Sequence, residues 1–277
     1  MSEPVEISGD VRLSSGERVR YLLRNLCRNL GWAAPLGSAP RFTAPRHPAT
    51  PGTASPGRAL TEAWVRQRLP RLLDPANPVS ILEIGCGSGR MARMLAELGY
   101  HGRYCGVDIG ERFDATAVEG METRFIQTDI HRFDPGEERF DLILSVSALE
   151  HIPSDRVLLD KLPGWLAREG LEVHIVPGGW GLLVYLWHGF RQYPLARIAK
   201  VFRGREEAVE PLGGFFSFLL HFLFITLGEL LLPLRLRKRA GRVYTGLLDL
   251  ALKFDQFLPW TPVMHVMRRR GPTGARS

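Results

Sequence analysis

The stretch Ile81-Leu82-Glu83-Ile84-Gly85-Cys86-Gly87-Ser88-Gly89-Arg90 decides the fold of this chain. It continues a short apolar run, Val79–Ile84, whose length and composition predict a buried strand. Three glycines then alternate with other residues, and residues 89–99 repeat apolar side chains at helical spacing. A strand that ends in a glycine loop and leads into a helix is the architecture of a nucleotide cleft at the carboxyl edge of a parallel sheet. Glycine allows the backbone to approach a ligand closely there.

The spacing of these glycines indicates which nucleotide the loop would bind. The pattern is G-x-G-x-G, whereas dinucleotide pyrophosphate loops have G-x-G-x-x-G. Glu83 precedes the loop, and a carboxylate there would repel a pyrophosphate. The same carboxylate would attract, directly or through water, the cationic methionine end of S-adenosylmethionine.

An aspartate follows the next predicted strand, Tyr104–Val107. Asp108 lies 19 residues after Gly89, and its carboxylate can accept hydrogen bonds from both hydroxyls of a ribose. Ile109 can then lie against the face of the adenine. An ordinary aspartate at a strand end is the alternative for Asp108 alone, but the glycine loop one strand earlier favours the ribose.

A third acidic position follows the short strand predicted over residues 124–127. The Asp129 carboxylate can accept from the adenine amino group, while the backbone amide of Ile130 donates to the ring. This signal is weak alone, and its place in the order of the strands supports it.

Strands and helices alternate from about residue 59 onwards, which predicts a parallel sheet with helices on both faces. The predicted helices are Leu60–Leu73, 89–99 and Ser154–Arg168, and further strands are predicted at Asp141–Val146 and Glu172–Val176.

The segment from Phe140 to Ile152 brings Glu150 and His151 to the mouth of the expected cleft. His151 is the candidate catalytic residue, because a histidine with an ordinary pKa near 6.5 suits proton abstraction from a substrate hydroxyl. An orienting or packing role in the Leu-Glu-His turn is the alternative, and is the one we favour from the sequence. Methyl transfer from a sulfonium depends mainly on the positioning of the acceptor and the methyl group, so an acid or base contributes little to its rate.

Residues 60–178 resemble the class I S-adenosylmethionine-dependent methyltransferases, and within them the type 11 group. The motifs that carry the resemblance are Glu83-x-Gly85-x-Gly87-x-Gly89, Asp108, Thr128-Asp129, and Phe140-Asp141 running to Leu149-Glu150-His151. The resemblance implies a seven-stranded, mostly parallel, doubly wound sheet with S-adenosylmethionine as cofactor. One departure is Glu169-Gly170-Leu171, where many members have a Pro-Gly-Gly turn.

The resemblance also implies roles for individual residues. The loop from Gly85 through Cys86 to Gly89 borders the methionine part of the cofactor, Asp108 the ribose, and Asp129 with Ile130 the adenine. Residues from Ser145 to Leu149 line the side of methyl transfer.

Substrate residues are expected beyond this shared core, in residues 177–200, where large apolar faces and polar tips mix. His188, Arg191 and Tyr193, together with Glu150, are the candidates, and they suit a glycan or an amphipathic acceptor. Arg191 can pair with an acidic group such as a phosphate. Packing of the last strands and a cap is the alternative for these side chains.

Two segments precede the core. Residues 14–31 predict an amphipathic helix with a capping box at Ser14 and Glu17, packing on its own domain or else meeting a membrane or a partner. Residues 33–58 contain six prolines and predict a linker. The expected division is therefore helix 1–32, linker 33–58, cofactor domain 59–200 and C-terminal extension 201–277.

The C-terminal extension contains 18 uncharged residues, 211–228, and then the basic run Arg235-Leu236-Arg237-Lys238-Arg239. We expect residues 212–239 to dock on a membrane as an amphipathic or re-entrant segment. A buried helix that roofs an apolar substrate pocket, and a true membrane span, are the alternatives.

Charge and cysteine content limit the partners and the compartment. Residues 59–198 carry a net charge of −4 and residues 199–277 a net charge of +7, so no uniformly basic surface for nucleic acid is expected. Three scattered cysteines and an acidic N-terminus without a signal peptide predict a cytoplasmic protein, peripheral at the inner face of a membrane. No metal site is expected.

The sequence therefore predicts an S-adenosylmethionine-dependent methyltransferase whose acceptor is a hydroxyl of a glycan, a lipid-linked sugar or a lipophilic metabolite. A small-molecule methyltransferase without a membrane role, and a scaffold that binds the cofactor without methyl transfer, are the alternatives.

Overall fold

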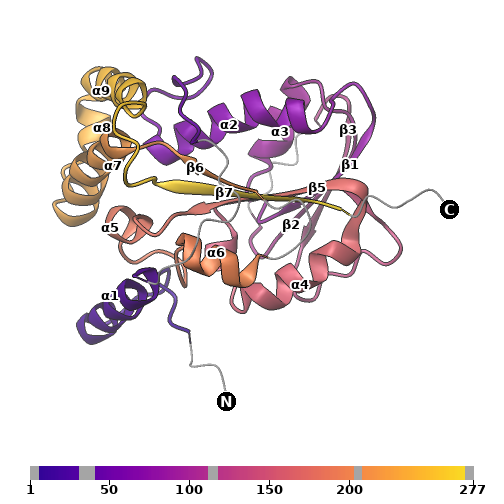
Figure 1. Ribbon diagram of the computed structural model, residues 1–277, viewed down its shortest axis with the longest axis horizontal. Helices are drawn as coiled ribbons and strands as arrows, with labels where there is room; N and C mark the ends of the chain where they lie inside the picture. Colours follow the sequence, from indigo (N-terminus) through magenta and orange to yellow (C-terminus); the bar gives the residue numbers. More distant parts are fainter. Residues whose placement is uncertain (1–5, 31–40, 112–117, 203–207, 272–277) are drawn as a thin grey trace.

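A seven-stranded sheet forms the centre of the molecule in the computed structural model, which describes residues 6–30, 41–111, 118–202 and 208–271 (Figure 1). The strand order is β3-β2-β1-β4-β5-β7-β6; β1 to β5 pair in parallel, and β7 is antiparallel to both β5 and β6. The strands are β1 (Val79–Ile84), β2 (Gly102–Asp108), β3 (Met121–Gln127), β4 (Phe140–Val146), β5 (Leu166–Pro177), β6 (Ala208–Leu212) and β7 (Met264–Arg270). This is the doubly wound class I methyltransferase fold that the sequence predicts.

Helices cover both faces of the sheet. Figure 1 shows α2 (Pro56–Leu72) and α3 (Arg90–Glu97) on one face, and α4 (Asp155–Trp165) and α6 (Leu195–Val201) on the other. Each face has its own apolar core, because successive side chains of a strand point to opposite faces. All six residues of β1 are buried, as expected for a central parallel strand.

The remaining helices gather at one end of the molecule, at the left of Figure 1. They are α1 (Ser15–Asn29), α5 (Gly181–Tyr185), α7 (Phe215–Leu220), the π-helix η2 (His221–Leu231), α8 (Leu236–Arg239) and α9 (Gly241–Phe254). The exception is the short 3₁₀ helix η1 (Leu149–His151), which follows β4. The capping box predicted for α1 is present: the Ser14 side chain accepts from the Glu17 N–H, and the Glu17 carboxylate accepts from the Ser14 N–H at 2.8 Å.

The C-terminal segment corrects the predicted domain division. The predicted extension contains β6 and β7, which complete the sheet, so these described strands belong to the cofactor domain. The sequence analysis assigned neither strand. The β7 segment, Met264–Arg270, ends in three arginines, and this pattern is not typical of a buried strand.

The predicted linker also differs from the structure in its described part, residues 41–58. Phe42 is buried and pairs with Leu212 in a parallel bridge, and the Thr50 hydroxyl donates to Glu62 at 2.5 Å. Arg46 forms an ion pair with Asp249 at 2.9 Å. The described part of this proline-rich segment therefore packs against the domain.

Two predicted boundaries move for a shared reason. The helix expected over 154–168 ends at Trp165, and the strand expected over 172–176 begins at Leu166. Leu166 pairs with Phe140 on β4, and Glu169 accommodates the irregularity at a φ of +60°. The departure from a Pro-Gly-Gly turn thus coincides with a bulged start of β5.

The apolar segment predicted to dock on a membrane forms α7 and η2. Phe216, Phe218 and Phe222 pack against the core, whereas Leu223, Leu227 and four further leucines up to Leu234 are exposed. Within the described part of the chain, no helix has both the length and the apolar character that crossing a bilayer requires.

Candidate cofactor and acceptor site

The glycine loop lies at the carboxyl ends of β1 and β2, next to the first turn of α3. Gly85, Gly87 and Gly89 have φ angles of +74°, +52° and +71°, in the left-handed region that side chains disfavour. A Cβ at Gly85 would lie 2.4 Å from the Cβ of Ala148, so this loop and the turn after β4 touch. A Cβ at Gly87 would meet no atom within 4 Å, so the backbone there borders open space.

The Asp108 carboxylate is held in a fixed orientation at the end of β2. Its Oδ2 accepts from the Gly87 N–H at 2.8 Å, and its Oδ1 accepts from the Gly110 N–H at 2.8 Å. Ile109 beside it is 76% exposed, unusually high for a large apolar side chain in a folded domain. This arrangement suits a ribose on the carboxylate and a flat aromatic base on the isoleucine.

Glu83 differs from the carboxylate that the sequence predicts. Its side chain is buried on β1 and accepts a hydrogen bond from the Tyr104 hydroxyl. Burial raises the pKa of Glu83 to about 8, against the opposing effects of Tyr104 and Arg90. Near pH 7 this group is therefore a neutral carboxylic acid, and it cannot attract a cationic ligand by its own charge.

The other predicted cofactor residues lie around this cleft in different ways. The Cys86 side chain is buried beneath the loop against Gly106, so its backbone, not its thiol, lines the loop. Asp129 is exposed after β3, and the Ile130 side chain is buried. Ser145 is fully buried with its hydroxyl 2.7 Å from Nδ1 of His174, and so it does not line the cleft.

The residues at this cleft fit S-adenosylmethionine. Gly87 leaves room for a ligand against the backbone, Asp108 presents a preorganised carboxylate, and Ile109 presents an apolar face. Gly85, Gly87, Asp108 and Ile109 would hold the cofactor, with Asp129 near its base.

A second group of residues gathers where β4 and β5 end. Asp10 Oδ2 lies 2.7 Å from His151 Nδ1, so Nδ1–H donates and Nε2 carries the lone pair. Nε2 of His188 lies 3.9 Å from Oε1 of Glu150, and the rings of His151 and His188 meet edge to face at 4.5 Å. Three of these four residues are predicted from the sequence, and the structure brings them together.

The protonation states within this cluster follow from its burial and charges. Burial acts to lower the pKa of His151, but the Asp10 hydrogen bond and the Glu150 and Asp10 charges raise it above the usual value. Burial raises the pKa of Glu150 to about 7. Burial and the neighbouring His151 lower the pKa of His188 to about 4. His188 is therefore neutral at pH 7, and His151 is the stronger base.

Donor atoms of Asp10, His151 and His188 all lie within 4.8 Å of one another, close enough for one metal ion to bind all three. The hydrogen bond from His151 already satisfies Asp10 without an ion. The Glu150 Oε2 atom is buried and has no hydrogen-bond partner among the described residues.

Gly189 joins the three segments that build the cluster. Its φ is +63°, its N–H donates to Asp10 at 3.1 Å, and its carbonyl accepts from the Gly9 N–H at 2.7 Å. A Cβ at Gly189 would lie 2.5 Å from the carbonyl oxygen of Glu150. Only glycine therefore allows the N-terminal segment, the turn after β4 and the loop after α5 to approach this closely.

Replacing Gly189 with alanine should destabilise the fold by about 1 to 3 kcal/mol, because alanine must adopt a positive φ and displace Glu150. Equilibrium urea unfolding followed by circular dichroism measures this change. Gly164→Ala on α4 is the matched control, since a Cβ there would meet nothing within 4 Å and its φ is not positive. Equal free energies of unfolding for the two variants would contradict the tight packing at Gly189.

Arg191 and Tyr193 lie away from the cluster. Tyr193 is fully buried, and its hydroxyl donates to Asp155 at 2.6 Å. Arg191 is 1% exposed and bonded to Glu6 and to the Ile152 carbonyl. Both side chains therefore bond to other residues of the protein.

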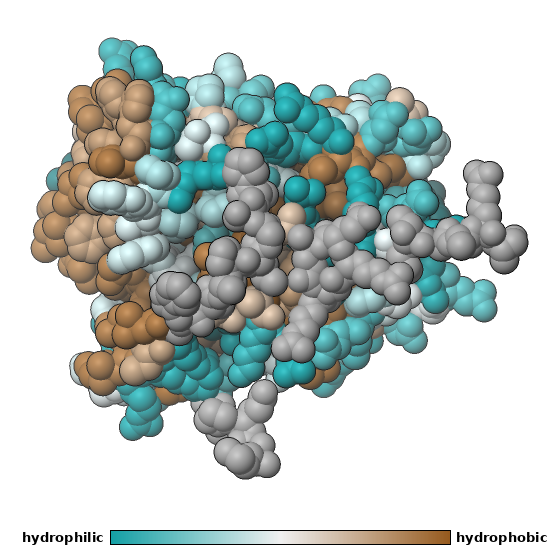
Figure 2. Space-filling view, viewed as in Figure 1, coloured by the Kyte–Doolittle hydropathy of each residue, from teal (hydrophilic) through white to brown (hydrophobic). Residues whose placement is uncertain are grey.

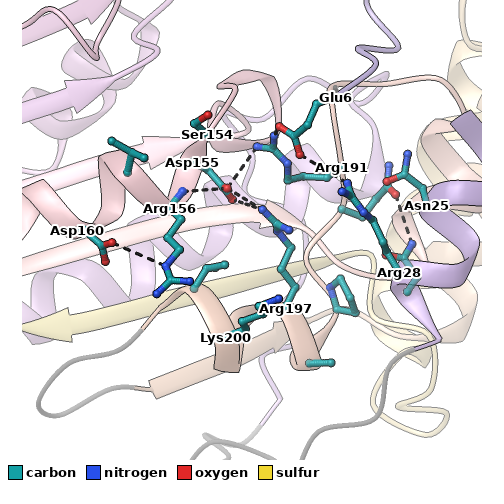
Figure 3. Close-up of a pocket in the computed structure, with 16 residues that line it drawn as sticks. Glu6, Asn25, Arg28, Ser154, Asp155, Arg156, Asp160, Arg191, Arg197 and Lys200 are labelled. Carbon is teal, nitrogen blue, oxygen red and sulfur yellow. Dashed lines mark hydrogen bonds and ion pairs between the residues drawn. The ribbon is translucent and has the colours of Figure 1, made fainter. Parts of the chain in front are cut away.

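Arg191 nevertheless lines a polar groove of about 740 Å³ between α1, α4 and α6 (Figure 3). The segments that form the cluster continue into this groove, from Asp10 back to Glu6, from His151 to Ser154 and from His188 to Arg191. Its charged lining residues are Glu6, Arg28, Asp155, Arg156, Asp160, Arg191, Arg197 and Lys200. The four arginines pair with lining carboxylates, and cations still outnumber carboxylates, so the groove has a net positive charge that suits a hydroxylated ligand with an acidic group.

The sequence reasoning missed Asp10. It lies 141 positions from His151 and in a segment without a motif, so only its place next to a turn before α1 could have drawn attention to it.

Comparisons with known proteins agree with this site. A sequence model of the family described as "Methyltransferase domain" matches residues 81–170, which run from β1 into β5 and include the glycine loop, Asp108 and His151. The chain therefore carries a class I S-adenosylmethionine-dependent methyltransferase domain, and S-adenosylmethionine is the cofactor of that domain.

Individual relatives are similar over the same region. A trans-aconitate 2-methyltransferase from Streptomyces avermitilis is 31% identical over 131 residues, covering 44% of this chain and 46% of the relative. A ubiquinone biosynthesis O-methyltransferase from Bradyrhizobium diazoefficiens is 30% identical over 112 residues, covering 39% and 43%. This chain thus spans a little under half the length of these curated relatives.

Solved structures share the fold over most of the chain. The plantazolicin methyltransferase BpumL, in complex with a triazolic desmethylPZN analog and SAH, has a TM-score of 0.51 at 20% identity and covers 81% of this chain and 87% of its own. The [4+2]-cyclase SpnF has a TM-score of 0.52 at 16% identity and covers 93% and 94%.

Proposed function

We propose that this protein transfers a methyl group from S-adenosylmethionine to a hydroxyl of a small-molecule acceptor, with His151 as the general base. One observation carries the proposal: His151, which Asp10 pairs with, stands on the turn whose Ala148 abuts Gly85 of the cofactor loop. A base and the cofactor cleft are therefore adjacent. The relatives that methylate small molecules support the same class of acceptor.

The chemistry divides between the cofactor and the chain. S-adenosylmethionine supplies a methyl group on a sulfonium, whose leaving group is already activated. Nε2 of His151 takes the proton of the acceptor hydroxyl, and Asp10 stabilises the resulting imidazolium through Nδ1. Glu150, a partly protonated acid at pH 7, is buried with its Oε1 atom 4.0 Å from Nε2 of His151, and its charge raises the pKa of that base.

The acceptor we propose is a glycan, a lipid-linked sugar or another lipophilic metabolite that carries an acidic group. The polar groove beside the cluster supports the hydroxylated and acidic part, and the aromatic rings of Tyr185 and Trp187 next to His188 support an apolar part. We place the protein in the cytoplasm, at the inner face of a membrane, and its three free cysteines support a reducing compartment.

Calorimetric titration of the full chain with S-adenosylmethionine and, separately, with NAD tests the cofactor; only the first should bind. Formation of S-adenosylhomocysteine with a panel of hydroxylated acceptors then tests transfer. This second measurement is needed because a fold shared with a cyclase does not establish the reaction. Tight cofactor binding without turnover on any acceptor would favour a binding scaffold.

The pH profile of kcat/KM should rise through a pKa above the usual 6.5 of histidine and then level, because only neutral His151 accepts a proton. Asp10→Asn removes a charge that raises this pKa, so the rising limb should move to lower pH. Glu150 faces the same ring, so Glu150→Gln should move the limb in the same direction, whereas His188, with a pKa near 4, is neutral throughout. A profile unchanged in both variants would contradict the role of His151.

A further inference from the structure

Exposed apolar side chains gather at the end of the molecule where α1, α5, η2 and α9 meet. Figure 2 shows them as brown surface at the left, over α7 and α9 and again over α1. The members of this apolar face are Val19, Leu23, Leu26, Trp180, Leu183, Leu223, Leu227, Leu230, Val243, Leu247, Leu250, Phe254, Phe257 and Trp260, and each is at least 36% exposed. Soluble monomers rarely expose so many large apolar side chains together.

These helices bury one side and expose the other. On α9, Tyr244, Leu248 and Leu252 are buried in the core, while Val243, Leu247 and Leu250 point outwards. The outward side chains therefore do not contribute to the packed core. Contacts run from α1 to α5 and from α5 to η2, and Trp180 at the N-cap of α5 and Leu183 within it are exposed, so α5 links the two apolar areas.

The charges around this face are almost all positive. Arg235, Lys238 and Arg239 are exposed between η2 and α9, and Arg242 is exposed on the first turn of α9. Two of the acids on these elements pair with arginines: Glu229 with Arg237 at 2.6 Å, and Asp249 with Arg46 at 2.9 Å. Glu17, at the start of α1, caps that helix through Ser14. An apolar face with a cationic rim matches the interior and the head groups of an anionic bilayer. A second copy of this chain would instead bring like charges together.

We propose that this face docks the protein peripherally on an anionic lipid bilayer. Trp180 and Trp260 on the face suit the interface between lipid and water, where tryptophan is enriched. The proposal names the surface and the lipid charge behind the membrane location proposed above, and it does not depend on the proposed reaction, since docking is measured without cofactor or acceptor. It does connect to the site, because α5 ends at Tyr185, three residues before His188. A lipid-linked acceptor would thus reach the cluster from the docked side.

Flotation of the full chain with vesicles tests the proposal. We expect binding to vesicles of phosphatidylcholine with phosphatidylglycerol and at least a hundredfold weaker binding to phosphatidylcholine alone, since each cation near the surface contributes about fivefold. Added salt should weaken the binding, because it screens the head-group charges. Absence of binding to anionic vesicles would overturn the proposal.

Two variants separate the apolar and the cationic contributions. Leu230→Asp with Leu250→Asp should weaken vesicle binding at least tenfold, and Val157→Asp on α4, an equally exposed position away from the face, should leave it unchanged. Changing Arg235, Lys238, Arg239 and Arg242 to glutamine should remove the preference for phosphatidylglycerol. Thermal unfolding confirms that each variant is folded.

Light scattering after size exclusion provides the competing outcome. If the protein is a dimer that Leu230→Asp with Leu250→Asp dissociates, and the same substitutions leave vesicle binding unchanged, the face binds a second copy. That result would overturn docking. A monomer whose vesicle binding falls with the same substitutions supports the bilayer.

Discussion

Replacing His151 with alanine should lower kcat by a factor of about 10² to 10⁴, the usual contribution of a positioned general base. The reason lies in the geometry of the pair: Asp10 accepts from Nδ1–H at 2.7 Å, which leaves Nε2 unprotonated and available to an acceptor hydroxyl. Asp10 also raises the pKa of His151, which strengthens the base. The measurement is the rate of S-adenosylhomocysteine formation at saturating acceptor.

Controls distinguish this loss from a structural one. Cofactor affinity should change little in the His151 variant, because the cofactor residues lie on the ends of β1 and β2. His101→Ala replaces a histidine at the start of β2, remote from the cluster, and should retain full activity. Added imidazole should restore part of the rate to His151→Ala. A variant that keeps its wild-type kcat would remove His151 from the reaction and leave it the orienting role in the turn.

Replacing Asp108 with alanine should weaken S-adenosylmethionine binding at least tenfold, about 1.4 kcal/mol, and up to about a hundredfold if both ribose hydroxyls are bonded. The Gly87 and Gly110 N–H groups hold the carboxylate in place, so its orientation costs little entropy on binding. Calorimetric titration of the full chain measures the dissociation constant.

A matched control removes another carboxylate that accepts a hydrogen bond from a backbone N–H nearby in the sequence. Asp134 accepts from the Gly136 N–H in a turn outside the cleft, and Asp134→Ala should keep the wild-type affinity. Unchanged affinity in the Asp108 variant would exclude this residue from the cofactor site. A loss of the same size in both variants would indicate a general effect of removing a turn carboxylate.

Much of the cofactor half of the site could be predicted from the sequence, because its determinants are local. The strand Val79–Ile84, the glycines after it and the aspartate at the end of the next strand follow from apolar patterning and from backbone angles that only glycine adopts readily. Glu83 is the exception. Its protonation depends on burial against Tyr104, a residue of the neighbouring strand, and a linear pattern does not report that burial.

The acceptor half depended on contacts between distant segments. The sequence placed Glu150, His151 and His188 near one another, but Asp10 joins them only because Gly189 lets the N-terminal segment approach. Arg191 and Tyr193 were predicted on the same grounds as His188. The Arg191 side chain instead bonds to Glu6, and the Tyr193 hydroxyl bonds to Asp155.

The sequence by itself determined the doubly wound sheet, the class of cofactor and the cofactor loop, since a strand, a turn and a helix are encoded by residues next to one another. Tertiary structure decided that β6 and β7 complete the sheet, that His151 gains Asp10, and that apolar residues of α1, α5, η2 and α9 form one face. The physical reason is that each of these features needs segments far apart in the chain to pack together, and the free energy of that packing belongs to the whole fold.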